Sequence, residues 1–317
     1  MLKKIWYVIP CFNESEVISE TARRLLELLN NLIFNLKISN DSRILFVDDG
    51  SIDDTWEKIK DIIEKDNHFC AIKLSSNRGH QNALMAGLTE AGKYADAVIS
   101  MDADLQDDIN ASRDMIEHYL KGAEIVFGVR SSRKTDTFFK RHSAQNFYKL
   151  MTRLGTKTVY NHADYRLMSK KALQALSKYK EVNLFLRGIV PDLGFKSVVV
   201  TYKRGKRFAG KSKYPFKKML SFAVEGITSF SIKPLKAAVL FGGGSFIISA
   251  IMLIYCIYQK IIGNTVPGWS SLGVSIWAVG GLQLLLIGII GEYVGKIYIE
   301  TKRRPRYIID ETINIES

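Results

Sequence analysis

Two long stretches without a charged residue lie near the C-terminal end of the sequence, and they restrict its fold more than any other feature. The first covers residues 237–259 and the second covers residues 261–291, with only Lys260 between them. A helix needs about 20 apolar residues to cross a hydrocarbon core of about 30 Å. Because the second stretch opens with a turn-like segment, Gly263–Gly268, we expect transmembrane helices over 237–259 and 271–292. The length of both stretches disfavours the alternative, a buried helical hairpin in a soluble protein.

Basic residues flank the two stretches on the sides away from the connecting loop. Lys233 and Lys236 precede the first stretch. Further basic residues follow the second: Lys296, Lys302, Arg303, Arg304 and Arg306. Basic flanks stay in the cytoplasm. We therefore predict a multi-pass protein of the cell (inner, cytoplasmic) membrane. Its large N-terminal domain, its basic tail over 293–317 and both termini are expected in the cytoplasm.

The net charge of +13, from 45 Lys+Arg and 32 Asp+Glu, is concentrated just before the first span. Between residues 196 and 236 there are eleven basic residues and one acid, Glu225. Such a run suits nucleic acid, an anionic membrane or an anionic substrate. The adjacent spans favour the membrane, so we predict no nucleic-acid partner, and amphipathic interfacial helices within 206–236.

The first 205 residues have the pattern of an α/β domain. Short apolar runs, each followed by polar or turn residues, predict strands over 5–9, 43–47, 71–74, 97–101 and 124–128. Helical spacing of apolar residues follows from Ser15, and a second helix is expected from Asp53 or Asp54. This alternation predicts a mostly parallel sheet covered on both faces. The three cysteines have no paired or metal-type spacing, which excludes a disulfide scaffold.

Polar residues follow the carboxyl ends of the predicted strands, where ligands bind in open α/β sheets. They are Glu14, Asp48, Asp49, Asn77, Asp102, Asp104 and Arg130. Taken singly, each has a structural alternative as a helix cap or a turn residue. Their common place at one edge of a sheet favours a single binding crevice.

Asp102 and Asp104, directly after a buried strand, form the sharpest chemical signal in the sequence. Paired carboxylates are hard oxygen ligands that suit Mg²⁺ or Mn²⁺, which are often shared with substrate phosphates. No G-x-x-x-x-G-K-[ST] motif occurs, and no G-x-G-x-x-G follows a strand. A P-loop kinase or ATPase and a dinucleotide oxidoreductase are therefore disfavoured.

Several segments together resemble family 2 glycosyltransferases of the GT-A fold, and more narrowly their polyprenyl-phosphate members, such as bactoprenol glucosyltransferases and dolichyl-phosphate mannose synthases. These segments are Val8–Glu14, Val47–Ser51, Asn77–His80, Asp102–Asp107, Ala163–Met168, Arg207–Tyr214, Gly291–Tyr298 and Arg304–Tyr307. They cover nearly the whole chain in the family's order. One departure is Asp108-Ile109, where many relatives have paired prolines, so we expect a different start to the following helix.

The resemblance implies the transfer of a sugar from a nucleotide donor to a polyprenyl phosphate, with inversion at the anomeric carbon. It implies a metal at Asp104, with Asp102, and a catalytic role for Asp104, Asp164 and Arg130. It also assigns donor-binding residues: Pro10, Glu14, Asp48, Asp49, Asp102, Asp104, Gln106, Arg207 and Lys211. The nucleophile is an anionic phosphate oxygen, so Asp164 is interpreted either as a general base or as a positioning residue.

The acceptor phosphate is assigned to Arg130 and Arg141, whose guanidinium groups bind phosphate at two points, and to Lys213. Arg207, Lys211 and Lys213 lie in a glycine-containing loop that could close over the diphosphate. The alternative for this loop is binding to anionic lipid headgroups. Both interpretations stay open.

UDP-glucose is the donor that the resemblance favours, while a UDP-N-acetylhexosamine, a UDP-pentose derivative and GDP-mannose remain open. The resemblance also implies a homo-oligomer. A processive polysaccharide synthase is disfavoured because none of the four tryptophans belongs to a Q-x-x-R-W element. A non-enzymatic membrane scaffold on the same fold is the remaining alternative, and the intact Asp102/Asp104 pair disfavours it.

Overall fold

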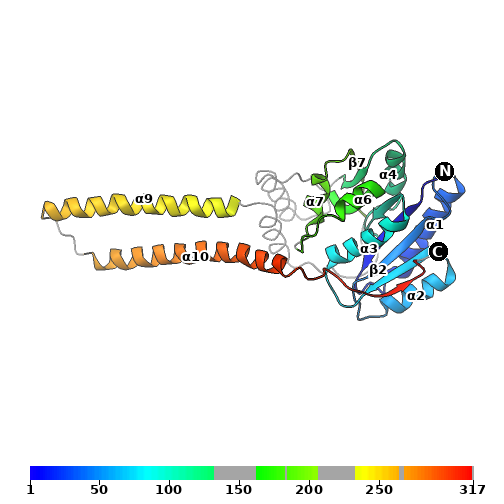
Figure 1. Cartoon of the computed structure of the whole chain (residues 1–317), viewed down its shortest axis with the longest axis horizontal. Helices are drawn as coiled ribbons and strands as arrows, with labels where there is room; N and C mark the ends of the chain where they lie inside the picture. The colour runs from blue at the N-terminus through cyan, green and yellow to red at the C-terminus, as the bar shows by residue number, and fades with distance from the viewer. Residues whose placement is uncertain (132–161, 183, 206–232, 264–267, 316–317) are drawn as a thin grey trace. The chain divides into compact units, whose positions relative to one another are not determined.

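The computed structural model of the chain describes residues 1–131, 162–182, 184–205, 233–263 and 268–315 (Figure 1). The predicted ligands Arg141, Arg207, Lys211 and Lys213, and the predicted interfacial helices up to residue 232, lie outside these residues. The described residues form two units. One contains those before residue 206 together with those from Arg304 onward, and the other contains those from Lys233 to Arg303.

The first unit is built on an eight-stranded sheet with the strand order β7-β5-β6-β4-β1-β2-β3-β8. Its strands are β1 (Ile5–Cys11), β2 (Arg43–Asp48), β3 (Phe69–Leu74), β4 (Ala97–Ser100), β5 (Ile125–Arg130), β6 (His162–Ser169), β7 (Ser197–Tyr202) and β8 (Ile309–Ile313). Strands β4, β1, β2 and β3 pair in parallel, as do β5 and β7. β6 is antiparallel to β4 and β5, and β8 is antiparallel to β3. The predicted mostly parallel α/β domain is thus confirmed.

Helices cover both faces of this sheet because its strands alternate apolar side chains between the two faces. They are α1 (Ile18–Phe34), α2 (Thr55–Lys65), α3 (His80–Tyr94), α4 (Ala111–Leu120), α6 (Lys170–Leu176) and α7 (Leu186–Asp192). Ile5, Tyr7 and Ile9 of β1 belong to the core cluster that also contains residues of α1, α2 and α4. Val8, between them in sequence, packs toward α3, where a Cβ on Gly87 would lie 2.4 Å from its Cγ1.

The five strands predicted from the sequence all exist, with small changes at their ends. β1 does not stop before Pro10 but continues to Cys11. Its pairing with β4 ends at Val8, opposite Ser100, whereas its pairing with β2 continues. Pro10 therefore lies beyond the β4 ladder, where a residue without an N–H group disrupts no pairing on that side.

The segment predicted as a basic tail over 293–317 contains regular structure. The second long helix continues to Thr301, and residues Ile309–Ile313 then form β8 at the edge of the sheet. The tail is anchored by side chains as well: Trp56 donates to Glu311 at 3.2 Å and Arg43 donates to the carbonyl of Asn314 at 2.6 Å. The pairing partner of β8 lies more than two hundred residues earlier in the sequence, so local patterning could not reveal it.

The second unit contains two long apolar helices, α9 (Lys233–Ile261) and α10 (Trp269–Thr301). By length and composition, Lys233–Gln259 and Ala278–Thr301 could each cross a membrane, with mean hydropathies of 2.2 and 1.6. Both predicted spans therefore correspond to helices. The candidate span in α10, Ala278–Thr301, overlaps the predicted range of 271–292.

Candidate active site

The antiparallel pairing of β4 with β6 brings Asp164 next to the loop that carries Asp102 and Asp104. Ser100, the last residue of β4, pairs with Arg166, and its hydroxyl donates to the carbonyl of Asp164 at 2.6 Å. His80, the first residue of α3, completes the group. Its Nε2 lies 3.5 Å from Oδ1 of Asp102 and 3.6 Å from Oδ2 of Asp164. Two of the predicted residues thus share one partner that the sequence did not assign.

Two arginines hold the carboxylate of Asp164. Nη2 of Arg166 donates to Oδ1 at 2.5 Å. Arg187 spans both oxygens, with Nη2 donating to Oδ2 at 2.8 Å and Nε lying 3.4 Å from Oδ1. The side chain of Arg166 is 1% exposed, whereas that of Arg187 is 33% exposed. One cation is therefore part of the protein interior, and the other reaches the surface of the site.

These contacts decide the charge of the group. Burial by itself raises the pKa of Asp164, but the charge of Arg187, the contact with His80 and the charge of Arg166 hold that pKa well below its usual value. Burial lowers the pKa of His80, but Asp164 and Asp102 together raise it above its usual value. Asp164 is therefore ionised across the physiological pH range, and the two carboxylates favour a protonated His80.

The loop after β4 presents its two carboxylates unequally. Asp104 is 7% exposed and accepts a hydrogen bond from the backbone N–H of Gln106 at 3.1 Å. The side chain of Asp102 is 33% exposed. The loop is tied to α1, because the hydroxyl of Thr21 donates to the carbonyl of Ala103 at 2.8 Å. The sequence-predicted pair therefore occupies one fixed loop at the carboxyl end of β4.

A divalent metal at this pair would need ligands from the substrate or from water. Within the part of the chain that the structure describes, no group of three or more His, Cys, Asp or Glu side chains is arranged to hold a metal ion. Magnesium commonly keeps several waters and is bound through one or two carboxylates together with substrate phosphates. Asp102 and Asp104 fit that kind of site, and they do not form a complete protein cage.

Arg130, at the end of β5, is held by residues that the sequence did not single out. Its Nη2 lies 3.6 Å from Oδ1 of Asp107, and its Nε donates to the hydroxyl of Tyr202 at 3.5 Å. That hydroxyl donates to the same carboxyl oxygen at 2.7 Å. Burial, assisted by the charge of Asp102, raises the pKa of Asp107 to about 6. The parallel pairing of β5 with β7 places Arg130 opposite Tyr202, and so fixes this arrangement.

The predicted donor-binding residues of the first two strands lie at the carboxyl ends of β1 and β2. Pro10 is buried and Glu14 is partly exposed. The carboxylate of Asp49 accepts from the backbone N–H groups of Arg78 and Gly79, at 2.7 and 2.9 Å. Asp49 therefore fixes the peptide that leads into His80. Asp48 is fully buried, and its Oδ2 accepts from the backbone of Ser51 at 3.2 Å.

Gln106 connects the loop after β4, which carries Asp102 and Asp104, to the segment after β7. Its side-chain oxygen accepts from Arg204, and its backbone carbonyl accepts from the N–H of Gly205 at 2.8 Å. Residues 206–232 follow directly, outside the described residues. Gln106 thus contacts Gly205, the last described residue before the predicted acceptor loop.

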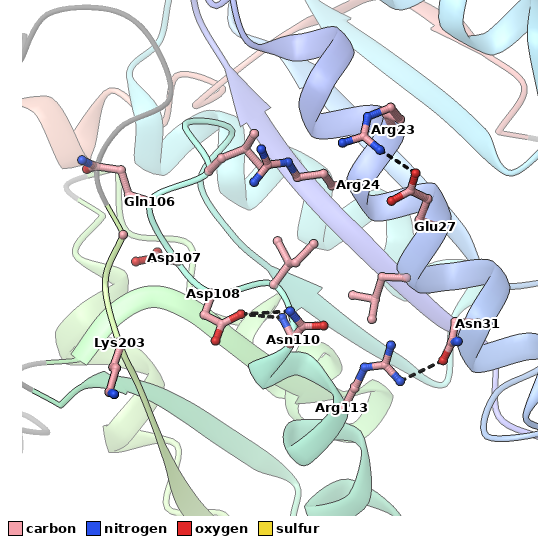
Figure 2. Close-up of a pocket in the computed structure, with 14 residues that line it drawn as sticks. Arg23, Arg24, Glu27, Asn31, Gln106, Asp107, Asp108, Asn110, Arg113 and Lys203 are labelled. Carbon is pink, nitrogen blue, oxygen red and sulfur yellow. Dashed lines mark hydrogen bonds and ion pairs between the residues drawn. The ribbon is translucent and has the colours of Figure 1, made fainter.

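Gln106 also lines a cavity of about 580 Å³ (Figure 2). Its lining residues come from α1, the 105–110 loop, α4 and the end of β7, and they do not include His80, Asp102 or Asp164. Its arginines are engaged with neighbours: Arg23 pairs with Glu27, and Arg113 donates to Asn31. This cavity is therefore not the place where the predicted residues Asp102 and Asp164 meet.

Sequence reasoning missed several residues of this site. They are His80, Arg166, Arg187, Asp107, Tyr202 and Arg204. His80, Asp107 and Arg166 stand inside segments that carry the family resemblance, which was the available signal. The others lie outside the sharp motifs, or gain their importance only from contacts across the sheet.

Comparisons with known proteins identify the family of this chain. Residues 6–177 match the model of the family described as glycosyl transferase family 2. An uncharacterized glycosyltransferase of Bacillus subtilis, YkoT, is 56% identical over 303 residues, which cover 96% of this chain and 90% of that protein. A prophage bactoprenol glucosyl transferase homolog of Escherichia coli is 40% identical over 314 residues, covering 96% of this chain and 98% of that protein.

A solved structure supports the fold independently of close sequence similarity. Mannosyl-3-phosphoglycerate synthase from Rubrobacter xylanophilus superposes with a TM-score of 0.50 at 13% identity, covering 73% of this chain and 74% of that one. The sheet, the carboxylate loop after β4 and these matches lead to one assignment. The chain belongs to glycosyl transferase family 2, with a GT-A-type catalytic domain.

Proposed function

We propose that this protein transfers a sugar from a nucleotide sugar, with UDP-glucose as the favoured donor, to a membrane-bound polyprenyl phosphate. The observation that carries the proposal is the meeting of Asp102 and Asp164 at His80, at the carboxyl edge of a family 2 sheet. Similarity over nearly the full length to proteins named bactoprenol glucosyl transferase supports the acceptor class.

The donor is assigned to the carboxyl ends of β1, β2 and β4. Pro10, Glu14, Asp48 and Asp49 are proposed to surround the nucleoside, with Asp102 and Asp104 at the diphosphate. Among the described residues, Oδ1 of the buried Asp48 has no hydrogen-bond partner, which suits a carboxylate that completes its contacts with a ligand. A divalent metal held by Asp104 and Asp102 would neutralise the diphosphate and stabilise the leaving nucleotide.

The acceptor is assigned to the side of Arg130. In the proposed reaction, an oxygen of the polyprenyl phosphate forms a bond to the anomeric carbon while the bond from that carbon to the nucleotide diphosphate breaks. The attacking oxygen is already anionic, so the step needs no strong base. Arg130 is fixed by Asp107 and Tyr202, and it is proposed to bind the lipid phosphate with Arg141 and Lys213.

The sheet and the two helices support the proposed membrane arrangement. β8 pairs with β3, so residues 309–313 share a compartment with the N-terminal domain. An even number of membrane crossings must then separate them, and α9 and α10 provide two candidates. The basic flanks place that compartment in the cytoplasm. We keep the predicted order of parts: domain 1–205, acceptor loop and interfacial helices 206–236, spans near 237–259 and 271–292, and a tail that returns to the domain.

The decisive experiment incubates the purified full-length protein with undecaprenyl phosphate and a panel of nucleotide sugars. The expected result is a lipid product formed from UDP-glucose and a divalent metal. Product from UDP-N-acetylhexosamine, a UDP-pentose derivative or GDP-mannose instead would change the sugar and keep the reaction. Absence of transfer from every donor, together with absence of donor hydrolysis, would favour the non-enzymatic scaffold.

A further inference from the structure

We propose that Arg187 binds a phosphate group of the substrates and that Asp164 acts as its positioning residue, not as a general base. The inference rests on the proposed function, because that function supplies the phosphate groups. It assigns a ligand to an arginine that neither the family motifs nor the strand-end argument identified. It also decides between the two roles that the sequence left open for Asp164.

Neighbouring side chains already occupy the lone pairs of the Asp164 carboxylate. An ionised carboxylate offers about four lone-pair sites on its two oxygens. Oδ1 receives Nη2 of Arg166 and Nε of Arg187, and Oδ2 receives Nη2 of Arg187 and faces His80. Donors therefore surround the whole carboxylate. A base must have an accessible lone pair directed at the proton that it removes, and this geometry provides none.

The two arginines that share Asp164 differ in their exposure to solvent. Arg166 is 1% exposed and also donates to the carbonyl of Leu186 at 3.3 Å, so its guanidinium faces only protein. Arg187 is 33% exposed while its bidentate contact holds the guanidinium plane in one orientation. A planar cation that a carboxylate holds in one orientation, and that is partly exposed, matches the geometry of phosphate recognition.

The side chains around Asp164 also lie close to the candidate metal carboxylate Asp102. His80 contacts both Asp164 and Asp102, so the group that orients Arg187 is one side chain away from the candidate metal carboxylate. A diphosphate bound at Asp102 and Asp104, or an acceptor phosphate attacking beside it, would lie in reach of the same cluster. Since the proposed nucleophile is already anionic, a fixed cation is more useful at this place than a base.

The test compares substitutions of both residues in the full-length protein. The variants are Arg187→Ala, Arg187→Lys, Asp164→Asn and Asp164→Ala, and Arg24→Ala serves as the matched control. Arg24 is 39% exposed and pairs with Glu20, so it also loses an ion pair, but it lies on α1 away from the cluster. UDP binding, undecaprenyl phosphate binding and transfer between pH 5.5 and 9 are measured separately. Thermal unfolding identifies any variant that fails to fold, in which case the lysine or asparagine variant replaces the alanine variant.

The expected result is a loss of transfer of about tenfold to a hundredfold for Arg187→Ala, since a charge-assisted contact contributes roughly 1.5–3 kcal/mol and about 1.4 kcal/mol is tenfold. Binding of UDP or of undecaprenyl phosphate should weaken with it, and the affected ligand identifies the phosphate. Arg187→Lys and added methylguanidinium should restore part of the loss. Asp164→Asn should lose less than Arg187→Ala and keep the wild-type pH profile, because its amide oxygen still accepts from Arg187.

Two results would overturn the inference. One is an Arg187→Ala variant that binds both ligands and transfers sugar as well as Arg24→Ala does. The other is an Asp164→Asn variant that loses the acidic limb of the pH profile and more activity than Arg187→Ala, which is the behaviour of a missing base. If the wild-type protein transfers no sugar, the proposed function fails, and the two binding measurements still decide the role of Arg187.

Discussion

Nε2 of His80 lies 3.5 Å from Oδ1 of Asp102, although one residue begins helix α3 and the other follows strand β4. The Asp49 carboxylate holds the backbone just before His80, at Arg78 and Gly79. The end of β2 thereby sets the position of an imidazole that contacts the carboxylate after β4. Three loops at the carboxyl edge of the sheet are joined by this chain of contacts.

The first prediction concerns His80. His80→Ala removes the group between Asp102 and Asp164, so both carboxylates lose a contact that orients them. We expect transfer to fall about twofold to tenfold, the range for one ordinary hydrogen bond at 0.5–1.5 kcal/mol. Steady-state rates with each substrate varied in turn measure the effect. His118→Ala, on α4, is the control, and equal activity of the two variants would contradict the assigned role.

The second prediction concerns the candidate metal site. Asp104→Asn removes a negative oxygen ligand while it keeps the shape of the side chain. We expect a loss of at least about a hundredfold in metal-dependent transfer, with thermal unfolding close to that of the wild type. The transfer rate is measured while Mg²⁺ or Mn²⁺ is titrated. Asp114→Asn, at an exposed position on α4, is the control. Normal turnover at either metal would show that Asp104 is not the ligand.

The third prediction separates the acceptor from the donor. Arg130→Ala removes the cation held by Asp107 and Tyr202 at the end of β5. We expect transfer to fall about tenfold to a hundredfold, the range for one charge-assisted contact. Donor binding, measured by calorimetry with UDP, should stay nearly unchanged. Loss of donor binding with a normal dependence on lipid concentration would place Arg130 at the diphosphate instead.

The fourth prediction tests the packing of α3 on the sheet. A Cβ on Gly87 would lie 2.4 Å from Cγ1 of Val8 and 2.6 Å from Cγ2 of Val47, so either these valine side chains or the helix must shift. We expect Gly87→Ala to lower the free energy of unfolding by about 1–3 kcal/mol, as overpacking does. Gly92→Ala in the same helix meets Leu173 at 3.4 Å and should be neutral or slightly stabilising. Thermal unfolding of both variants decides, and equal stability would exclude a close approach at Gly87.

The fifth prediction concerns membrane topology. β8 belongs to the same sheet as β3, so the C-terminus shares the compartment of the N-terminal domain. Because the basic flanks favour the cytoplasm for that compartment, a cytoplasmic reporter fused after Ser317 should be active and a periplasmic reporter there should be inactive. A reporter inserted between Gly263 and Gly268 should behave as an external one. Matched pairs of cytoplasmic and periplasmic reporters at both positions make the measurement. External activity of the C-terminal fusion is incompatible with the proposed arrangement.

The sequence by itself determined the local elements and their order. Apolar runs of four or five residues became β1 to β5, and uncharged stretches of membrane-spanning length became α9 and α10. The carboxyl ends of parallel strands share one edge, so the positions of Asp102, Asp104 and Arg130 followed from strand prediction alone. These features depend on near neighbours in the chain, and a residue pattern records them directly.

Only the tertiary structure decided which side chains meet. Asp164 gained its two arginines and His80 from β6, α7 and α3, and Arg130 gained Tyr202 from β7. The pairing of β8 with β3 joins residues that lie more than two hundred positions apart. Strand register and helix placement set such contacts, and both depend on how distant apolar faces pack. A single sequence carries no local record of that packing, so the partners of Asp164 became known only from the folded chain.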